Sequence, residues 1–85
     1  MEHDLKIEPV YFEQKLSGHK PWEIRKNDRN YKEGDILHLR EWENGSYTGR
    51  ELYQTIESLF QDDRYLQLGF VILTGMIFYD IKEDK

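Results

Sequence analysis

The strongest constraint on the fold is a continuous apolar run, Phe70-Val71-Ile72-Leu73. Four consecutive apolar residues are typical of a strand that is covered on both faces, because an edge strand usually alternates with polar residues. The run lies within a segment from Gly69 to Ile81 that is rich in Val, Ile, Phe and Tyr. We expect a central strand here, bent or interrupted near Gly75, because glycine inside a strand often marks a bend.

Alternating apolar residues and turn residues predict further strands. Ile36–Trp42 alternates between two faces, which indicates a strand with at least one buried face. Arg50–Phe60 also fits a helical spacing, but its alternation and its Tyr and Thr residues favour a strand. Asn44-Gly45 is the strongest turn signal and is typical of a hairpin or an irregular loop. The remaining predicted strands are His3–Ile7 and Trp22–Lys26, the second opened by Pro21.

One helix is predicted from Pro9 to Ser17. Proline is favoured in the first turn of a helix, and Phe12 and Leu16 lie one turn apart. Gly18 can end the helix in the left-handed conformation. The segments predicted as loops are Asn27–Gly34 and Gln61–Leu68, the second with room for a single helical turn.

These elements predict an α+β fold in a single domain that covers residues 1–85. We expect five or six strands with one or two helices, arranged as a small mixed sheet that is partly closed into a pseudo-barrel. A chain of 85 residues leaves no room for separate catalytic and substrate domains.

Composition argues against several kinds of site. The chain contains no cysteine, which excludes disulfides and thiolate metal sites. His3, His19 and His38 lack the spacing of a metal site, and no Walker loop or dinucleotide fingerprint is present, so we expect no metal and no cofactor. No apolar run near the N-terminus suggests a signal peptide or a membrane span, so a cytoplasmic protein is expected.

Charge is distributed unevenly along the chain. The net charge is −5, and residues 41–85 form the more acidic part. Residues 15–32 are instead mainly basic, with only Glu23 and Asp28 as acids. The basic residues of this segment are Lys15, Lys20, Arg25, Lys26, Arg29 and Lys32. A local positive surface can therefore coexist with an acidic remainder, and a solvated surface without a ligand is an equally simple interpretation.

Three charged residues follow the predicted helix end closely: Lys20, Glu23 and Arg25. Glu23 and Arg25 are two apart on a predicted strand, so their side chains point to the same face. Trp22 and Ile24 are then expected to point the other way, into the core. The spacing predicts one cleft that holds all three charged groups.

The pattern of this segment, Gly18-x-Lys20-x-x-Glu23-x-Arg25, resembles the G-x-K-x-x-E-x-R signature of the ASCH family, named for activating signal cointegrator homology. The strand and helix before the motif are also similar to this family. So are the segments Arg25–Arg29, Gly34–Leu37 and Tyr47–Arg50. The resemblance covers nearly the whole chain and implies a PUA-like pseudo-barrel with a helix beside a cleft.

The resemblance implies that the cleft binds RNA or a nucleotide, with a role in RNA metabolism or transcription regulation. Arg25 can bind a phosphate through its planar guanidinium, Lys20 can add a charge, and Glu23 can accept a hydrogen bond from a base amino group. The residues expected to bind the ligand are Gly18, Lys20, Glu23, Arg25, Lys26, Arg29, Tyr47 and Arg50. The aromatic residues considered for base stacking are Tyr31, Trp42 and Tyr47.

Other functions are compatible with the same residues. Some bacterial members of the resembled family are amidohydrolases of N4-acetylcytidine, thought to use a threonine, a lysine and a glutamate. Lys20 matches their lysine, whereas Glu23 stands where their threonine would be. If the chain is an enzyme, Lys20 and Glu23 are its catalytic residues, with Glu23 activating water and Lys20 stabilising the oxyanion. The charged trio can also be an internal ion-pair network, and the acidic C-terminal half is compatible with a protein-interaction module.

Overall fold

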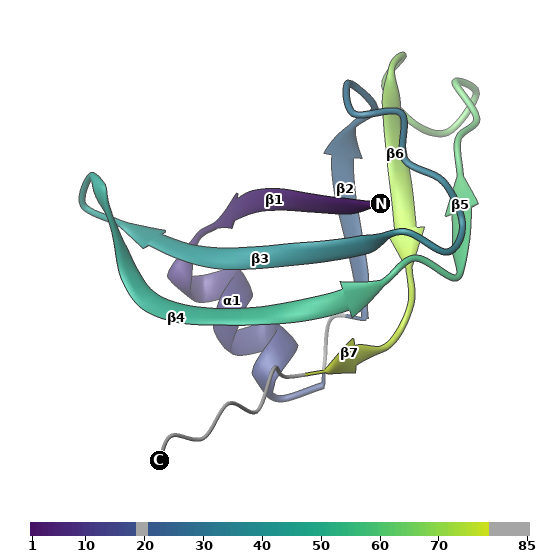
Figure 1. Cartoon of the computed structure of the whole chain (residues 1–85). Helices are drawn as coiled ribbons and strands as arrows, with labels where there is room; N and C mark the ends of the chain where they lie inside the picture. Colours follow the sequence, from purple (N-terminus) through teal and green to yellow (C-terminus); the bar gives the residue numbers. More distant parts are fainter. Residues whose placement is uncertain (19–20, 79–85) are drawn as a thin grey trace.

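The helix and the strands predicted from the sequence are present in the computed structural model, which describes residues 1–18 and 21–78. The elements in chain order are β1 (Glu2–Ile7), α1 (Pro9–Leu16), β2 (Trp22–Lys26), β3 (Ile36–Glu43), β4 (Ser46–Thr55), β5 (Ser58–Phe60), β6 (Phe70–Thr74) and β7 (Ile77–Phe78) (Figure 1). The described residues form seven strands rather than the five or six expected, because two predicted strands are each divided in two.

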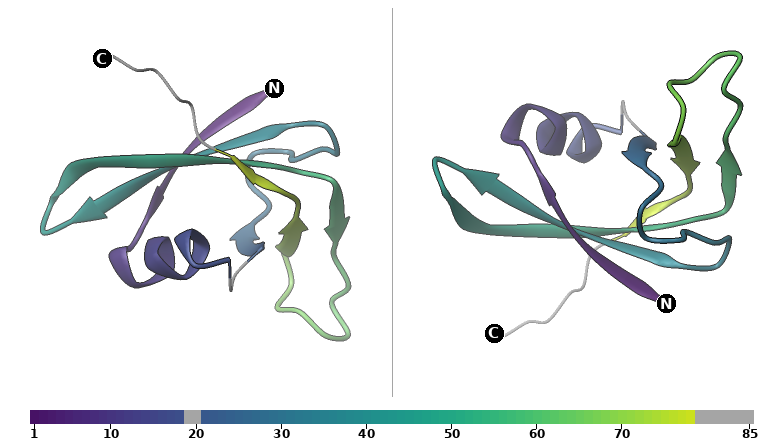
Figure 2. Two further views of the ribbon diagram at one scale, coloured as in Figure 1. Left: turned by 90° about the horizontal axis from the view of Figure 1, so that it is seen from below. Right: turned by 90° about the horizontal axis from the view of Figure 1, so that it is seen from above.

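The strands form two sheets, with orders β1-β3-β4-β7 and β2-β6-β5. Only the β1–β3 pair is parallel among the described pairs, so one sheet is mixed and the other is antiparallel. The described residues are mostly in strands with one short helix, which is compatible with the predicted α+β class. In Figure 2, α1 lies on one side of the long β3–β4 hairpin and beside β2. This arrangement places the end of β1, the start of α1 and β2 around one region.

The two sheets meet where the chain bends sharply between strands. β4 leads into β5 through Ile56 and Glu57, and β6 leads into β7 through Gly75 and Met76. The Glu57 N–H donates to the Thr74 carbonyl at 2.7 Å. The bend near Gly75 was predicted, but the break inside the predicted strand Arg50–Phe60 was not, because the apolar alternation continues through it.

A two-residue turn joins β3 to β4. Asn44 and Gly45 have φ values of 53° and 85°, which is the left-handed conformation that a tight hairpin turn requires at both positions. The sequence allowed a hairpin or an irregular loop at this pair, and the structure has the hairpin. Because the turn is so short, β4 begins at Ser46, four residues before the predicted start at Arg50.

The sheets do not close into a barrel. The free edges of β1 and β2 belong to different sheets, and two arginine side chains, one on β2 and one in the loop after it, reach the carbonyls of the β1 edge. Arg25 donates to the Lys6 carbonyl at 2.8 Å, and Arg29 donates to the Asp4 carbonyl at 3.1 Å. These guanidinium groups satisfy edge carbonyls that a neighbouring strand would otherwise bind.

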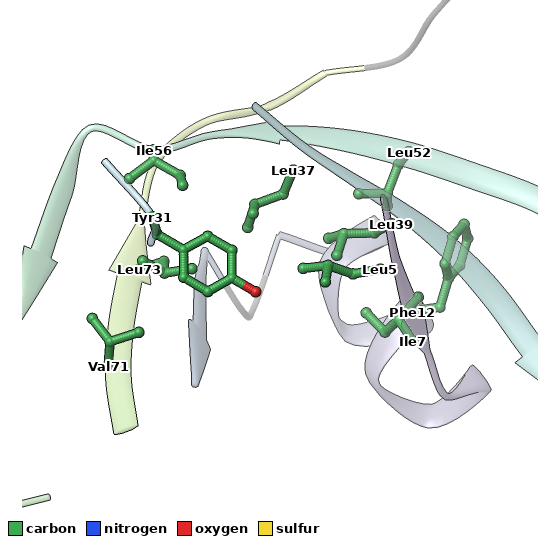
Figure 3. Close-up of a cluster of buried hydrophobic side chains, with 10 residues drawn as sticks. All are labelled: Leu5, Ile7, Phe12, Tyr31, Leu37, Leu39, Leu52, Ile56, Val71 and Leu73. Carbon is green, nitrogen blue, oxygen red and sulfur yellow. The ribbon is translucent and has the colours of Figure 1, made fainter. Parts of the chain in front are cut away.

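Apolar side chains from both sheets and α1 form one core (Figure 3). Its buried members are Leu5, Ile7, Phe12, Tyr31, Leu37, Leu39, Leu52, Ile56, Val71 and Leu73. On α1 the buried face contains Phe12 and Lys15, whereas Leu16, expected to share that face with Phe12, is 37% exposed. The helix is therefore turned so that a lysine rather than a leucine enters the interior.

The orientation of β2 is the reverse of the expected one. Glu23 is buried at 4% exposure, whereas Trp22 and Ile24 are 39% and 46% exposed, so the prediction that these two residues enter the core was wrong. Glu23 and Arg25 lie opposite Leu73 and Val71, whose side chains face the core. The prediction that Glu23 and Arg25 share one face of the strand was correct. The alternation of side chains along a strand does not say which of its two faces is covered by the core.

The described part of the chain has no helix that is long and apolar enough to cross a membrane.

Candidate functional site

A cleft of about 420 Å³ lies between the end of β1, the start of α1 and β2. Its lining residues are Lys6, Ile7, Glu8, Tyr11, Trp22, Glu23, Ile24 and Arg25. Pro9 at the start of α1 turns the chain immediately after β1, which places Glu8 and Tyr11 beside the strand end. Four consecutive residues of β2 form the opposite wall. The volume lies within the range of small-ligand sites.

An ion-pair cluster forms the inner part of the cleft. The Glu23 carboxylate accepts from Lys15 Nζ at Oε1, 3.1 Å away, and from Arg25 Nε and Nη2 at Oε2, 2.7 and 2.6 Å away. Lys15 and Arg25 carry two positive charges against the one negative charge of Glu23. The cluster therefore leaves a net positive charge beside the cleft, which favours an anionic group in a ligand.

Lys15 is the central residue that sequence reasoning missed. Its side chain is fully buried, and its Nζ also donates to the Trp22 carbonyl at 3.0 Å and to Gln54 Oε1 at 2.8 Å. The Gln54 amide in turn donates to the Pro21 carbonyl at 3.3 Å. The available signal was the position of Lys15 three residues after Phe12, on the same face of the helix.

Arg25 is the predicted ligand residue that the structure places best for contact with a ligand. It lines the cleft, binds Glu23 and retains a side-chain exposure of 24%. Glu23 also lines the cleft, as predicted, but its side chain is only 5% exposed. Lys20, the third member of the predicted trio, lies outside the described residues, as does His19.

The aromatic residues of the cleft differ from those considered for stacking. Tyr11 and Trp22 line it, with exposures of 43% and 39%. Tyr31 is a core residue at 5% exposure, and burial raises the pKa of its hydroxyl. Trp42 and Tyr47 pack edge to face on the β3–β4 hairpin, with ring centroids 4.8 Å apart. Any base stacked in the cleft would therefore contact Tyr11 or Trp22.

Arg50, another residue predicted to bind the ligand, belongs to a separate charged cluster. Its guanidinium donates to both oxygens of Glu41, at 2.9 and 2.8 Å, and to Glu13 at 2.7 Å. Together with the hydroxyl of Thr48, which donates at 2.6 Å, Arg50 lowers the pKa of Glu41 to about 2. The Arg50 guanidinium also lies over the Phe12 ring, 4.6 Å from its centroid. These contacts tie β3, β4 and α1 together outside the cleft lining.

The other described residues that were predicted to bind a ligand do not line the cleft. Gly18 ends α1 with a φ of 81°, as the helix prediction required. Lys26 is exposed at the end of β2, Arg29 bridges to β1, and Tyr47 lies in contact with the Arg40 guanidinium, 3.8 Å from its ring centroid. Of the seven predicted ligand residues that the structure describes, it thus brings Glu23 and Arg25 alone to the cleft wall.

The arrangement suits recognition of a polar, partly aromatic ligand. Within residues 1–18 and 21–78, no group of three or more His, Asp or Glu side chains is placed to hold a metal ion. The cleft instead combines aromatic rings, aliphatic side chains, cations and carboxylates, which can bind a ring, a phosphate and hydrogen-bond donors at once.

Comparison with known proteins identifies relatives. A family model described as a domain of unknown function, DUF3850, matches residues 2–75. The chain is also 48% identical over 71 residues to a protein of Escherichia phage P2, described as an uncharacterized 12.9 kDa protein in the GpA 3' region. That match covers 84% of this chain and 64% of the phage protein, so this chain spans somewhat less than two thirds of its relative. Since the family model covers nearly all of the described sequence, the chain belongs to the DUF3850 family.

Proposed function

We propose that this domain binds RNA or a nucleotide in the cleft between β1, α1 and β2, as a PUA-like relative of the ASCH family. The observation that carries the proposal is the composition of the cleft wall. Tyr11 and Trp22 offer rings for stacking, and Arg25 offers a guanidinium beside a cluster with excess positive charge. The volume of the cleft, about 420 Å³, agrees with a ligand of one nucleotide, because sites for small ligands usually have volumes of about 300–1,000 Å³.

Arg25 provides the sharpest test of this proposal. Binding of a fluorescein-labelled single-stranded RNA pentamer is measured by anisotropy for the wild type, Arg25→Ala and Arg25→Lys. The matched control is Arg64→Ala, which removes the same charge from a side chain that is 77% exposed and outside the cleft lining. A thermal melt of each variant establishes that it is folded.

We expect Arg25→Ala to weaken binding about tenfold, because a hydrogen bond to a charged group contributes about 1.5–3 kcal/mol. Arg25→Lys should recover part of the loss, and Arg64→Ala should have little effect. Affinity should also fall as salt rises from 50 to 200 mM. Equal losses from Arg25→Ala and Arg64→Ala, or binding that does not respond to salt, would contradict the proposal.

Hydrolysis of an acylated nucleoside is the less favoured activity. Both oxygens of Glu23 are bound to cationic groups, so activating a water would require one of these contacts to break. Incubation with N4-acetylcytidine, with a known amidohydrolase as the positive control, tests this alternative directly. Release of acetate that disappears in Glu23→Gln would establish it.

A further inference from the structure

The backbone of β2 presents hydrogen-bonding groups to the cleft. In an antiparallel pair, opposed residues alternate between pairs that exchange both backbone hydrogen bonds and pairs that exchange none. The Asn27 N–H donates to the Gly69 carbonyl at 2.7 Å, and the Gly75 N–H donates to the Pro21 carbonyl at 3.4 Å. These contacts continue the β2–β6 register at both ends, so odd-numbered residues bond to β6. Even-numbered residues, Ile24 among them, direct their N–H and C=O to the open edge.

Most carbonyls on this edge are already used. The Trp22 carbonyl accepts from Lys15 at 3.0 Å, which agrees with its direction away from β6. The Lys26 carbonyl accepts from the Asp28 N–H at 2.8 Å. Ile24 lies between them, lines the cleft, and has neither its N–H nor its C=O in a hydrogen bond to another described residue outside the strand ladders. One donor and one acceptor therefore stand side by side on the cleft wall.

We propose that the cleft recognises an unpaired base, whose Watson–Crick edge binds the N–H and C=O of Ile24; this inference rests on the proposed function. Each of the four bases carries an adjacent donor and acceptor on that edge, which matches one extended residue of a strand edge. In a duplex the same edge is already paired. The ligand class is therefore single-stranded RNA or a free nucleotide rather than a double helix.

The surroundings of Ile24 favour a base over an extended peptide. An added peptide strand would pair with the same backbone groups, but it gains little from flanking aromatic rings. Trp22 and Tyr11 line the cleft with aromatic rings on which a base can stack. Arg25, the residue after Ile24, brings a guanidinium group that can bind a phosphate. The 420 Å³ of the cleft admits one nucleotide and is too small for a duplex.

Two sets of RNA probes test the inference without altering the protein. The first compares a uridine pentamer and a guanosine-containing pentamer with hairpins in which the same bases are paired. The second compares these pentamers with versions that carry N3-methyluridine or N1-methylguanosine, which block the Watson–Crick edge and keep the ring and the phosphates. We expect binding at least about tenfold weaker for the hairpins and for the methylated pentamers, since each loses a bonded donor–acceptor pair.

A protein variant provides the matching test. Ile24→Pro removes one N–H from the open edge of an edge strand, where proline is tolerated. It should weaken binding of the unmodified pentamers and have little additional effect on the methylated ones. Lys26→Ala, which removes a neighbouring charge and leaves the Ile24 backbone unchanged, is the control; it should change binding of methylated and unmodified RNA by the same factor and so keep the preference for unmodified RNA. If Ile24→Pro fails to fold, the probe comparison decides alone.

The outcomes separate this inference from the proposed function. Equal affinity for hairpins, methylated pentamers and unmodified pentamers would overturn the inference while RNA binding itself stands. Absence of binding to every RNA and mononucleotide would overturn both. Binding of a blocked Val-Thr-Val-Thr peptide, lost in Ile24→Pro while no RNA binds, would assign the edge to a peptide and contradict the inference.

Discussion

At the scale of single residues, the distinguishing feature is a carboxylate held between two cations in the interior. Lys15 and Glu23 have side-chain exposures of 0% and 5%, so both lose nearly all of their hydration on folding. Such a loss is compensated only when every charge keeps its partners. The cluster joins α1 to β2 and borders the cleft, so the same residues hold the fold together and set the charge beside a ligand.

Removing the carboxylate should be costly. Glu23→Gln removes the carboxylate that binds both Lys15 and Arg25, and breaking a buried pair in this way costs about 3–5 kcal/mol. The double variant Lys15→Met/Glu23→Gln should be less destabilised than Glu23→Gln alone, because the buried amine is gone as well. Urea unfolding measures both free energies. A loss below about 0.5 kcal/mol in Glu23→Gln would show that the pair contributes little to stability.

Glu41 predicts a specific dependence of stability on pH. Contacts with Arg50 and Thr48 lower its pKa from 4.5 to about 2, so the folded state is favoured by its ionised form above pH 4.5. That contribution declines as pH falls from 4.5 toward 2. Glu41→Gln should therefore be less stable than the wild type at pH 6, and the difference should narrow by pH 2.5. A difference in unfolding free energy that stays constant over this range would contradict the assignment.

At the scale of secondary structure elements, the bends between strands decide how two sheets share one core. A Cβ atom on Gly75 would lie 1.7 Å from the Thr55 carbonyl oxygen, so the β6–β7 connection passes directly against the end of β4. The two elements can approach this closely only because glycine has no side chain. This glycine therefore allows the β6–β7 connection to pass against the end of β4.

Gly75→Ala is expected to displace this connection. We predict a thermal midpoint lower by about 10 °C or more, since relieving such an overlap should cost at least about 2 kcal/mol in a small domain. Met76→Ala is the control, because Met76 is the next residue and is 67% exposed. Differential scanning calorimetry distinguishes the two. Similar midpoints for both variants would mean that the backbone accommodates the methyl group without strain.

At the scale of the whole molecule, the outer face of the β2-β6-β5 sheet is unusually apolar. Its large apolar residues are Trp22, Ile24, Phe60, Phe70 and Ile72. Trp22, Ile24 and Phe60 are each about two fifths exposed. An uncovered sheet face normally carries polar side chains, and contiguous apolar patches on monomers are seldom larger than a few hundred Å².

We expect this face to promote weak self-association. Sedimentation velocity at rising protein concentration should show a dimer that Phe60→Ser weakens, because Phe60 is 45% exposed on the face. Tyr65→Ser is the control, since Tyr65 is 74% exposed in the loop after β5. A monomer at all concentrations, or equal effects of the two substitutions, would exclude this role for the face.

Local patterns determined most of the elements. Three elements were predicted correctly because each depends on preferences within a few residues. They are the strand at Ile36–Trp42, the turn at Asn44-Gly45 and the helix that begins at Pro9. The two-residue spacing also placed Glu23 and Arg25 together on one face of β2. The α+β class follows from these elements and did not require knowledge of distant contacts.

Only the tertiary structure decided which face of β2 is buried and which charges meet. Lys15 binds Glu23 and also Gln54, which is 39 residues away, and these contacts together allow a lysine rather than Leu16 to enter the interior. Likewise, Arg50 pairs with Glu41 and Glu13 instead of lining the cleft. Sequence spacing specifies which side chains share a face, but partners of long charged side chains come from elements that are distant along the chain. For this reason the sequence determined the strands, and the packing of α1 against two sheets determined the site.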